Sequence, residues 1–337
     1  MSDSLVTERF MKKRSILYLN DYSCSERELR FHLDRNAPLH HMWGVDALAG
    51  GGETVDILRH PSNPQGGGGI LCHLNLLYEN LRIFLRHCRC KTVFSALPGY
   101  EKGFLLANKI GLGHYKIVTV VHHPATRLHL IEQYDKLLFF SPTVREAFGN
   151  PSNSEYLFWG PDLEFYARHA LPAPAPACYE YDFVSAGKVY RDYDLFFRVI
   201  PGLTSRYKVF GAGSSVRNEI GYTDLMKVCS RTRFICLPVA KFQQEGRILV
   251  GLTAFLDAIA LGKPILMSDN TLIGIDVEAQ GLGLLYKAGD ESDFREKAAR
   301  LLALDDAQYA AMAARCRAFA AAHDYRKWSA RLARLLA

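Results

Sequence analysis

The stretch GLTAFLDAIALGKPILMSD, residues 251–269, carries the pattern that decides the fold. Its apolar spacing predicts a helix that begins after Gly251 and ends at Gly262, and a buried strand follows directly at 264–268. A helix that leads straight into a buried strand is the repeating unit of a parallel α/β sheet. We therefore expect the fold to be built from such units.

The same helix predicts a place for a phosphorylated ligand. The backbone N–H groups that follow Gly251, those of Leu252 and Thr253, would lie at its N-terminus and, with the Thr253 hydroxyl, would hold a diphosphate. Asp257 falls on the second turn, where its carboxylate faces the same region and suits a ribose diol. An ordinary crossover, with Gly262 as its C-cap, is the alternative interpretation.

Alternating strands and helices continue this pattern along the chain. Short β-rich apolar runs predict strands at 15–19, 54–58, 92–97, 116–121, 136–141, 156–159, 181–186, 207–211, 233–238 and 264–268. Helical spacing predicts helices at 40–48, 73–86, 101–110, 143–148, 193–200, 223–230 and 252–261, and more helix from 293 onward with a break near 323–324. The fold class is α/β.

A proline- and alanine-rich segment divides the chain. Residues 171–178 read LPAPAPAC, a composition that favours an extended, semi-rigid linker. We expect a first domain at 1–170, a linker at 171–180, a second domain at 181–322 and a last helix at 323–337. A chain of 337 residues is long enough for each domain to bury its own core. The cleft between two such domains is the expected ligand site.

Composition excludes several classes of protein. Apolar residues make up 49% and charged residues 23%, as in an ordinary globular chain. No apolar run reaches the roughly 18 residues of a membrane span, and the start, MSDSLVTERFMKKRS, is charged, so we expect a cytoplasmic protein. The eight cysteines lack the spacing of a zinc or redox site. A net charge of +6 without a basic tail disfavours nucleic acid as a partner and suits phosphate-bearing ligands or an anionic membrane surface.

Residues 256–265, LDAIALGKPI, resemble the donor-binding signature of retaining GT-B glycosyltransferases, in particular glycosyltransferase family 4. Asp257 stands where that family has a glutamate, and the resemblance assigns it to the ribose hydroxyls. The resemblance implies a GT-B fold, with two Rossmann-like domains whose parallel sheets face each other across a cleft. The first domain would bind the acceptor and the second the nucleotide-sugar donor, and the last helix would pack back on the first domain.

Two further stretches resemble the phosphate-binding parts of these enzymes. The run DFVSAGKVYR predicts a strand that ends at Gly187 and is followed by two cations, Lys188 and Arg191. The resemblance assigns both cations to the departing diphosphate, and solvated surface cations are the alternative. The run VFGAG places Gly211 and Gly213 at a strand end that resembles the loop beside the donor phosphates.

Candidate catalytic residues are less well defined. His122 and His123 follow the predicted strand at 116–121 and precede a proline, so they would project into the cleft. A histidine at this place contacts the transferred sugar in the family, and His123 is the preferred match, while a structural histidine is the alternative. The family's second acid falls on Leu249, and the nearest carboxylate is Glu245, four residues earlier in a polar loop.

Three arginines also share one face of a helix. Arg82, Arg86 and Arg89 recur at spacings of four and three residues. They suit an acceptor or an anionic membrane surface, and a solvated helix face is the alternative. The segment WGPDLEF, residues 159–165, resembles the crossing between the two domains of these enzymes.

As a whole, the resemblance implies transfer of a sugar from a UDP- or GDP-linked donor to a glycan or lipid-linked acceptor, with retention, in polysaccharide or glycolipid biosynthesis. No Asp-x-Asp pair is placed on a loop to hold Mg²⁺, so we expect neither a metal nor a further cofactor. Peripheral contact with the inner face of a membrane fits the mild positive charge. Two alternatives stay open: a GT-B nucleotide-sugar epimerase, and a catalytically inactive nucleotide-binding GT-B protein.

Overall fold

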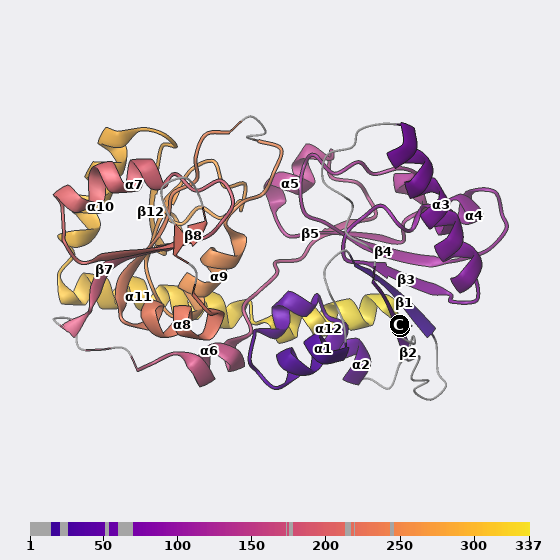
Figure 1. Cartoon of the computed structure of the whole chain (residues 1–337), viewed down its shortest axis with the longest axis horizontal. Helices are drawn as coiled ribbons and strands as arrows, with labels where there is room; N and C mark the ends of the chain where they lie inside the picture. Colours follow the sequence, from indigo (N-terminus) through magenta and orange to yellow (C-terminus); the bar gives the residue numbers. More distant parts are fainter. Residues whose placement is uncertain are drawn as a thin grey trace.

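The computed structural model describes residues 15–20, 26–50, 54–59, 70–172, 174, 178–212, 217–218, 220–242 and 246–337, which form two lobes side by side (Figure 1). The first lobe contains β1 (Ser15–Asn20), α1 (Glu26–Leu33), η1 (Leu39–Met42), α2 (Val45–Gly50), β2 (Thr54–Arg59), α3 (Ile70–His87), β3 (Thr92–Ser95), α4 (Lys102–Lys109), β4 (Lys116–Val121), η2 (Ile131–Gln133), β5 (Lys136–Phe139), α5 (Pro142–Ala147) and β6 (Ser154–Tyr156).

After α6 (Leu163–His169) the chain enters the second lobe. Its elements are β7 (Tyr181–Ala186), α7 (Tyr193–Val199), η4 (Ile200–Gly202), β8 (Tyr207–Ala212), β9 (Arg217–Asn218), α8 (Tyr222–Ser230), β10 (Thr232–Leu237), α9 (Leu252–Ala260), β11 (Ile265–Ser268), β12 (Gly283–Tyr286), α10 (Glu291–Leu302) and α11 (Asp306–Ala322). The last helix is α12 (Tyr325–Leu336).

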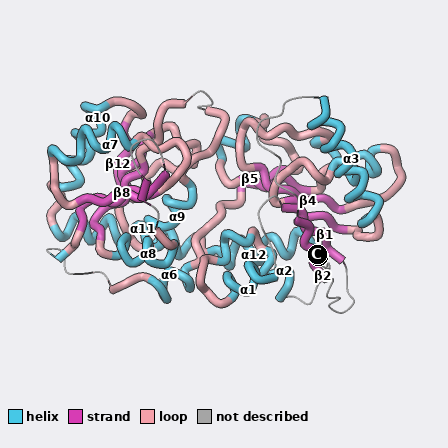
Figure 2. The backbone as a smooth tube through the Cα atoms, viewed as in Figure 1, coloured by secondary structure: helices cyan, strands magenta, loops and turns pink. Residues whose placement is uncertain are grey.

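Each lobe is built on one twisted sheet with helices around it (Figure 2). The first sheet has the strand order β2-β1-β3-β4-β5-β6, and all of its pairings are parallel. The second has the order β12-β11-β10-β7-β8-β9, parallel except for the short antiparallel pair β8–β9. These parallel sheets confirm the predicted α/β class. None of the helices within the described ranges is long and apolar enough to span a bilayer.

The chain passes between the lobes twice, and the two passages touch. At Gly160 an added Cβ would come within 1.4 Å of the carbonyl oxygen of His323, so only glycine fits where the passages meet. Beyond His323, α12 returns to the first lobe, where its buried Trp328 and Leu332 press on the backbone of Gly44. Arg331 on α12 forms a bidentate ion pair with Glu155, in which its Nε donates to Oε1 at 2.9 Å and its Nη2 to Oε2 at 2.7 Å.

The predicted helix at 40–48 is wrong, because the structure has two short elements there, η1 and α2. Trp43 and Gly44 separate them in left-handed conformations, with φ of 54° and 86°. The Trp43 ring lies parallel to that of Trp159, with centroids 4.6 Å apart, so tertiary packing fixes the break. Gly44 donates its N–H to the Tyr325 hydroxyl at 2.7 Å, which a continuous helix would not allow.

The other predicted elements overlap observed ones, with differences at their ends. The structure adds helices α1 and α6 and strands β9 and β12, which the sequence pattern did not reveal. β12 is short, and at its Gly283 an added Cβ would meet the Ile265 carbonyl oxygen at 1.9 Å. β12 can therefore form only where its backbone lies close to that of β11, and the spacing of apolar residues does not predict such a contact.

Candidate functional site

Strands β7 and β8 end side by side, and at Gly211 there is no room for a side chain. An added Cβ on Gly211 would come within 2.4 Å of the Gly187 carbonyl oxygen and 2.8 Å of the Tyr193 ring. The Tyr193 hydroxyl donates to the Gly187 carbonyl at 2.6 Å and also lies 3.0 Å from the Phe210 carbonyl. Two glycines and one tyrosine thus fix the strand ends, where ligands bind in parallel α/β sheets.

Arg191 folds back over this glycine turn. Its guanidinium Nε lies 2.6 Å from where a Cβ on Gly187 would be, and its Nη1 donates to the Val189 carbonyl at 3.0 Å. Its Nη2 lies 4.0 Å from the corresponding Cβ position on Gly251. Burial lowers the pKa of the Arg191 guanidinium, which nevertheless stays charged at neutral pH. Lys188 lies on the same turn with an exposed side chain.

The N-terminus of α9 begins at the place that Arg191 reaches. Gly251 is its N-cap, with a left-handed φ of 86°, and no side chain caps the helix. A Cβ here would come within 2.4 Å of the Leu237 side chain, at the end of β10. The N–H groups of Leu252 and Thr253 belong to the first helical turn and have no acceptor within the helix. The structure thus brings Gly187, Gly211, Gly251 and Arg191 together.

Asp257 is buried one turn further along α9 and is held by two tyrosines. Its Oδ1 accepts hydrogen bonds from the hydroxyl of Tyr166 at 2.6 Å and from the hydroxyl of Tyr222. Burial raises the pKa of this carboxyl to about 6, against the opposing effect of the two tyrosine bonds. Both of these bonds go to Oδ1, and no donor from the described part of the chain bonds Oδ2.

The two candidate histidines face different surroundings. His122 is buried, and its Nε2 lies 2.7 Å from the Ala96 carbonyl oxygen, while its ring packs on Trp43 and Phe140. Burial lowers the pKa of His122 to about 3, so the ring is neutral and donates to Ala96. The geometry makes His122 a core residue of the first lobe, in disagreement with its prediction as a residue that projects into the cleft.

His123 points across to the second lobe. Its Nδ1 accepts a hydrogen bond from the backbone N–H of Leu249 at 3.1 Å, and Ala125 donates its N–H to the Arg247 carbonyl at 2.9 Å. The loop that leads into α9 is therefore docked on the histidine loop. Two predicted site residues, Glu245 and Gly213, lie outside the described residues.

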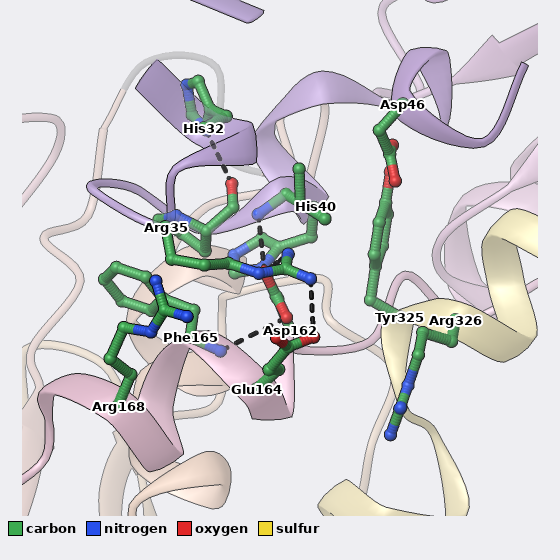
Figure 3. Close-up of polar contacts among 12 residues, drawn as sticks. His32, Arg35, His40, Asp46, Asp162, Glu164, Phe165, Arg168, Tyr325 and Arg326 are labelled. Atoms are coloured by element: carbon green, nitrogen blue, oxygen red, sulfur yellow. Dashed lines mark hydrogen bonds and ion pairs between the residues drawn. The ribbon is translucent and has the colours of Figure 1, made fainter. Parts of the chain in front are cut away.

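A polar network joins the start of α6 to residues of the first lobe (Figure 3). Asp162 caps α6 by accepting from the N–H of Phe165, and its other oxygen accepts from Arg35 at 3.0 Å. The Asp162 N–H donates to Nδ1 of His40 at 3.2 Å, and the His40 ring lies parallel to that of Tyr166. The network ties α6 to the first lobe and so fixes Tyr166.

Sequence reasoning missed both tyrosines of the site. Tyr166 and Tyr222 are 91 and 35 residues away from Asp257 in the chain, and no spacing pattern links them. The described residues contain no group of three or more His, Cys, Asp or Glu side chains that could hold a metal ion.

Comparison with solved structures identifies the fold. Anabaena HepE in complex with UDP and glucose shares 13% identity, covers 96% of this chain and 99% of its own, and has a TM-score of 0.59. Sucrose-phosphate synthase from Thermosynechococcus elongatus shares 12% identity over 96% of this chain and 98% of its own, with a TM-score of 0.70. The α,α-trehalose 6-phosphate synthase from Burkholderia multivorans gives the same values.

These similarities confirm the predicted GT-B fold, with its two Rossmann-like domains. No protein-family model matches the chain. No curated protein sequence matches it either. The similarity therefore lies in the arrangement of the backbone.

Proposed function

We propose that this protein is a glycosyltransferase that moves a sugar from a UDP- or GDP-linked donor to an acceptor hydroxyl. One observation carries the proposal: Arg191 reaches from the Gly187 turn to the uncapped N-terminus of α9. A guanidinium beside free helical N–H groups is suited to a diphosphate. Structures of the same fold, those of Anabaena HepE, hold UDP and UDP-glucose, which supports a nucleotide-sugar donor.

The donor would lie along the second lobe. Its diphosphate would accept hydrogen bonds from Arg191 and from the N–H groups of Leu252 and Thr253, with Lys188 closing over it. Its ribose would bond Oδ2 of Asp257, which lies one turn further along the same helix. Gly213 would belong to the adjoining phosphate loop, and the missing side chain at Gly211 lets the strand ends stay close.

In the proposed reaction the bond from the anomeric carbon to the diphosphate breaks. The acceptor oxygen forms the new bond on the same face, so the configuration is retained, and the hydroxyl proton leaves with the diphosphate. Arg191 and the helix dipole stabilise the departing charge, without a metal ion. His123 faces the loop at Leu249 and would position the sugar. Glu245 is proposed as the substitute for the second acid.

The first domain, 1–170, would bind the acceptor, and the second, 181–322, the donor. A glycan or lipid-linked acceptor in polysaccharide or glycolipid synthesis is proposed, with the protein in the cytoplasm or at the inner face of a membrane. The leucine at 249 favours one second candidate, a nucleotide-binding protein without turnover. An epimerase would instead convert a donor when no acceptor is present.

Titration calorimetry with UDP, GDP and ADP tests the donor site. Asp257→Ala should weaken nucleotide binding by more than about tenfold, because a hydrogen bond to a charged group contributes about 1.5–3 kcal/mol. Asp257→Asn keeps an oxygen for both tyrosines and separates loss of binding from loss of packing. Arg198→Gln is the matched control, since Arg198 is exposed and pairs with Glu291 away from the turn. Equal affinity in Asp257→Ala and the parent protein would refute the ribose role.

A further inference from the structure

The first lobe exposes a row of large apolar side chains. On α3, Leu77 is 67% exposed, Leu81 53% and Leu85 64%, at intervals of four residues that place them on one side of the helix. Tyr78 lies beside this row and is also exposed. An isolated exposed leucine needs no explanation, whereas an aligned row on a soluble surface marks an interaction site.

The apolar surface continues with Leu106 on the neighbouring helix α4 and with Ile110, the residue directly after that helix, which are 52% and 57% exposed. The two helices pack tightly, because Gly103 on α4 lies where an added Cβ would be 2.7 Å from Cβ of Phe84 on α3. Asn80 on α3 also accepts the N–H of Lys102 at 3.1 Å. We call the exposed residues Leu77, Tyr78, Leu81, Leu85, Leu106 and Ile110 the α3/α4 face, at the outer end of the lobe (Figure 1).

The charge around the α3/α4 face is positive. Residues 70–116 contain seven Lys or Arg and two Glu, a net charge of +5. Of the two acids, Glu79 pairs with Arg82 at 2.7 Å. Glu101 is 1% exposed and accepts the Tyr134 hydroxyl at 2.6 Å. Arg86 is exposed at the C-terminal end of the leucine row.

A basic hollow of about 750 Å³ opens where α3 and α4 end. Three of its lining side chains are cationic, those of Arg89, Lys91 and Lys116. Asp135 also lines it, and its Oδ2 accepts the N–H of Ile117 at 2.7 Å. The size and charge of the hollow suit a phosphate headgroup.

We propose that the α3/α4 face docks on an anionic lipid bilayer. The leucine row enters the boundary between headgroups and acyl chains, while the arginines and lysines contact lipid phosphates. A second copy of this chain would bring a surface of the same charge to this face, whereas an anionic bilayer brings the opposite charge. This docking does not depend on the donor site, so each proposal can fail without the other.

Vesicle co-sedimentation of the full chain tests the proposal. Vesicles of phosphatidylcholine with added phosphatidylglycerol should bind the protein, with binding that falls as salt rises, and pure phosphatidylcholine vesicles should bind it poorly. Arg86→Gln with Arg89→Gln should lower the partition coefficient about 25-fold, at roughly fivefold for each basic residue. Arg198→Gln with Arg300→Gln, on the second lobe, is the matched control and should change it little.

A second variant tests the apolar row. Leu77→Ser, Leu81→Ser and Leu85→Ser together should abolish binding to anionic vesicles. The helical signal in circular dichroism checks that this variant stays folded, because serine has a lower helix propensity than leucine. Binding of both variants at the parent level would overturn the proposal. A second result would also overturn it: the protein does not bind vesicles, and light scattering shows a dimer that the leucine changes dissociate. The face would then be the contact between two copies of the chain.

Discussion

Gly211→Ala is the sharpest structural test of the glycine turn. The new methyl group would lie 2.4 Å from the Gly187 carbonyl oxygen and 2.8 Å from the Tyr193 ring. The carbonyl is part of the backbone and cannot rotate away, so β7 and β8 must separate at their ends or Tyr193 must leave. Overpacking of this kind costs about 1–3 kcal/mol. Loss of the Tyr193 hydrogen bond to Gly187 adds about 1 kcal/mol.

We therefore expect the free energy of unfolding to fall by about 2–4 kcal/mol in Gly211→Ala, measured by urea denaturation. Displacement of the Gly187 turn also moves Arg191, so UDP affinity in calorimetry should fall by about tenfold or more. Gly202→Ala is the matched control, because its new methyl group would meet only the flexible Arg295 side chain, at 3.5 Å. If Gly211→Ala unfolds and binds UDP as the parent protein does, the close packing of the strand ends is refuted.

Two further changes test buried groups. Burial lowers the pKa of His41 to about 4 and that of His122 to about 3. As the pH drops below 6.5, these histidines therefore take up protons in the unfolded chain before they do so in the folded protein. The free energy of unfolding should then fall by about 1.4 kcal/mol per pH unit for each histidine. Asp257, whose pKa is raised to about 6, opposes this below pH 6. Urea denaturation at several pH values should show a shallower loss of unfolding free energy with acid in His122→Gln than in the parent protein, and equal slopes in the two proteins would contradict the assignment. Trp328→Ala should lower the free energy of unfolding by about 3–5 kcal/mol in urea denaturation, because that side chain is 1% exposed. A decrease under about 1 kcal/mol would show that α12 is not an integral part of the first lobe.

The sequence predicted α9 and its neighbours well because local patterns determine them. The helix expected at 252–261 is observed as Leu252–Ala260, and β11 follows it directly. Apolar spacing and the two flanking glycines are local signals, and they set where a helix begins and ends. The same holds for the α/β alternation that leads to two parallel sheets.

Tertiary contacts decide what the sequence could not show. The break at Trp43 and Gly44 exists because Trp159 and α12 pack there, more than one hundred residues further along the chain. Neighbouring residues at a strand end point to opposite sides, so sequence alone could not say which of His122 and His123 is buried. The tyrosines that hold Asp257 come from α6 and α8, and only the assembled lobes bring them together.

The place of α12 has a consequence for how the protein is made. Ribosomes build a chain from its N-terminus, and the first domain of a protein usually folds first. Here Trp328 and Leu332, which cover Gly44, are synthesised more than 280 residues after it. The first lobe therefore emerges from the exit tunnel with an uncovered seam, and it becomes complete only after the elements of the second lobe, β7 to α11, have been synthesised.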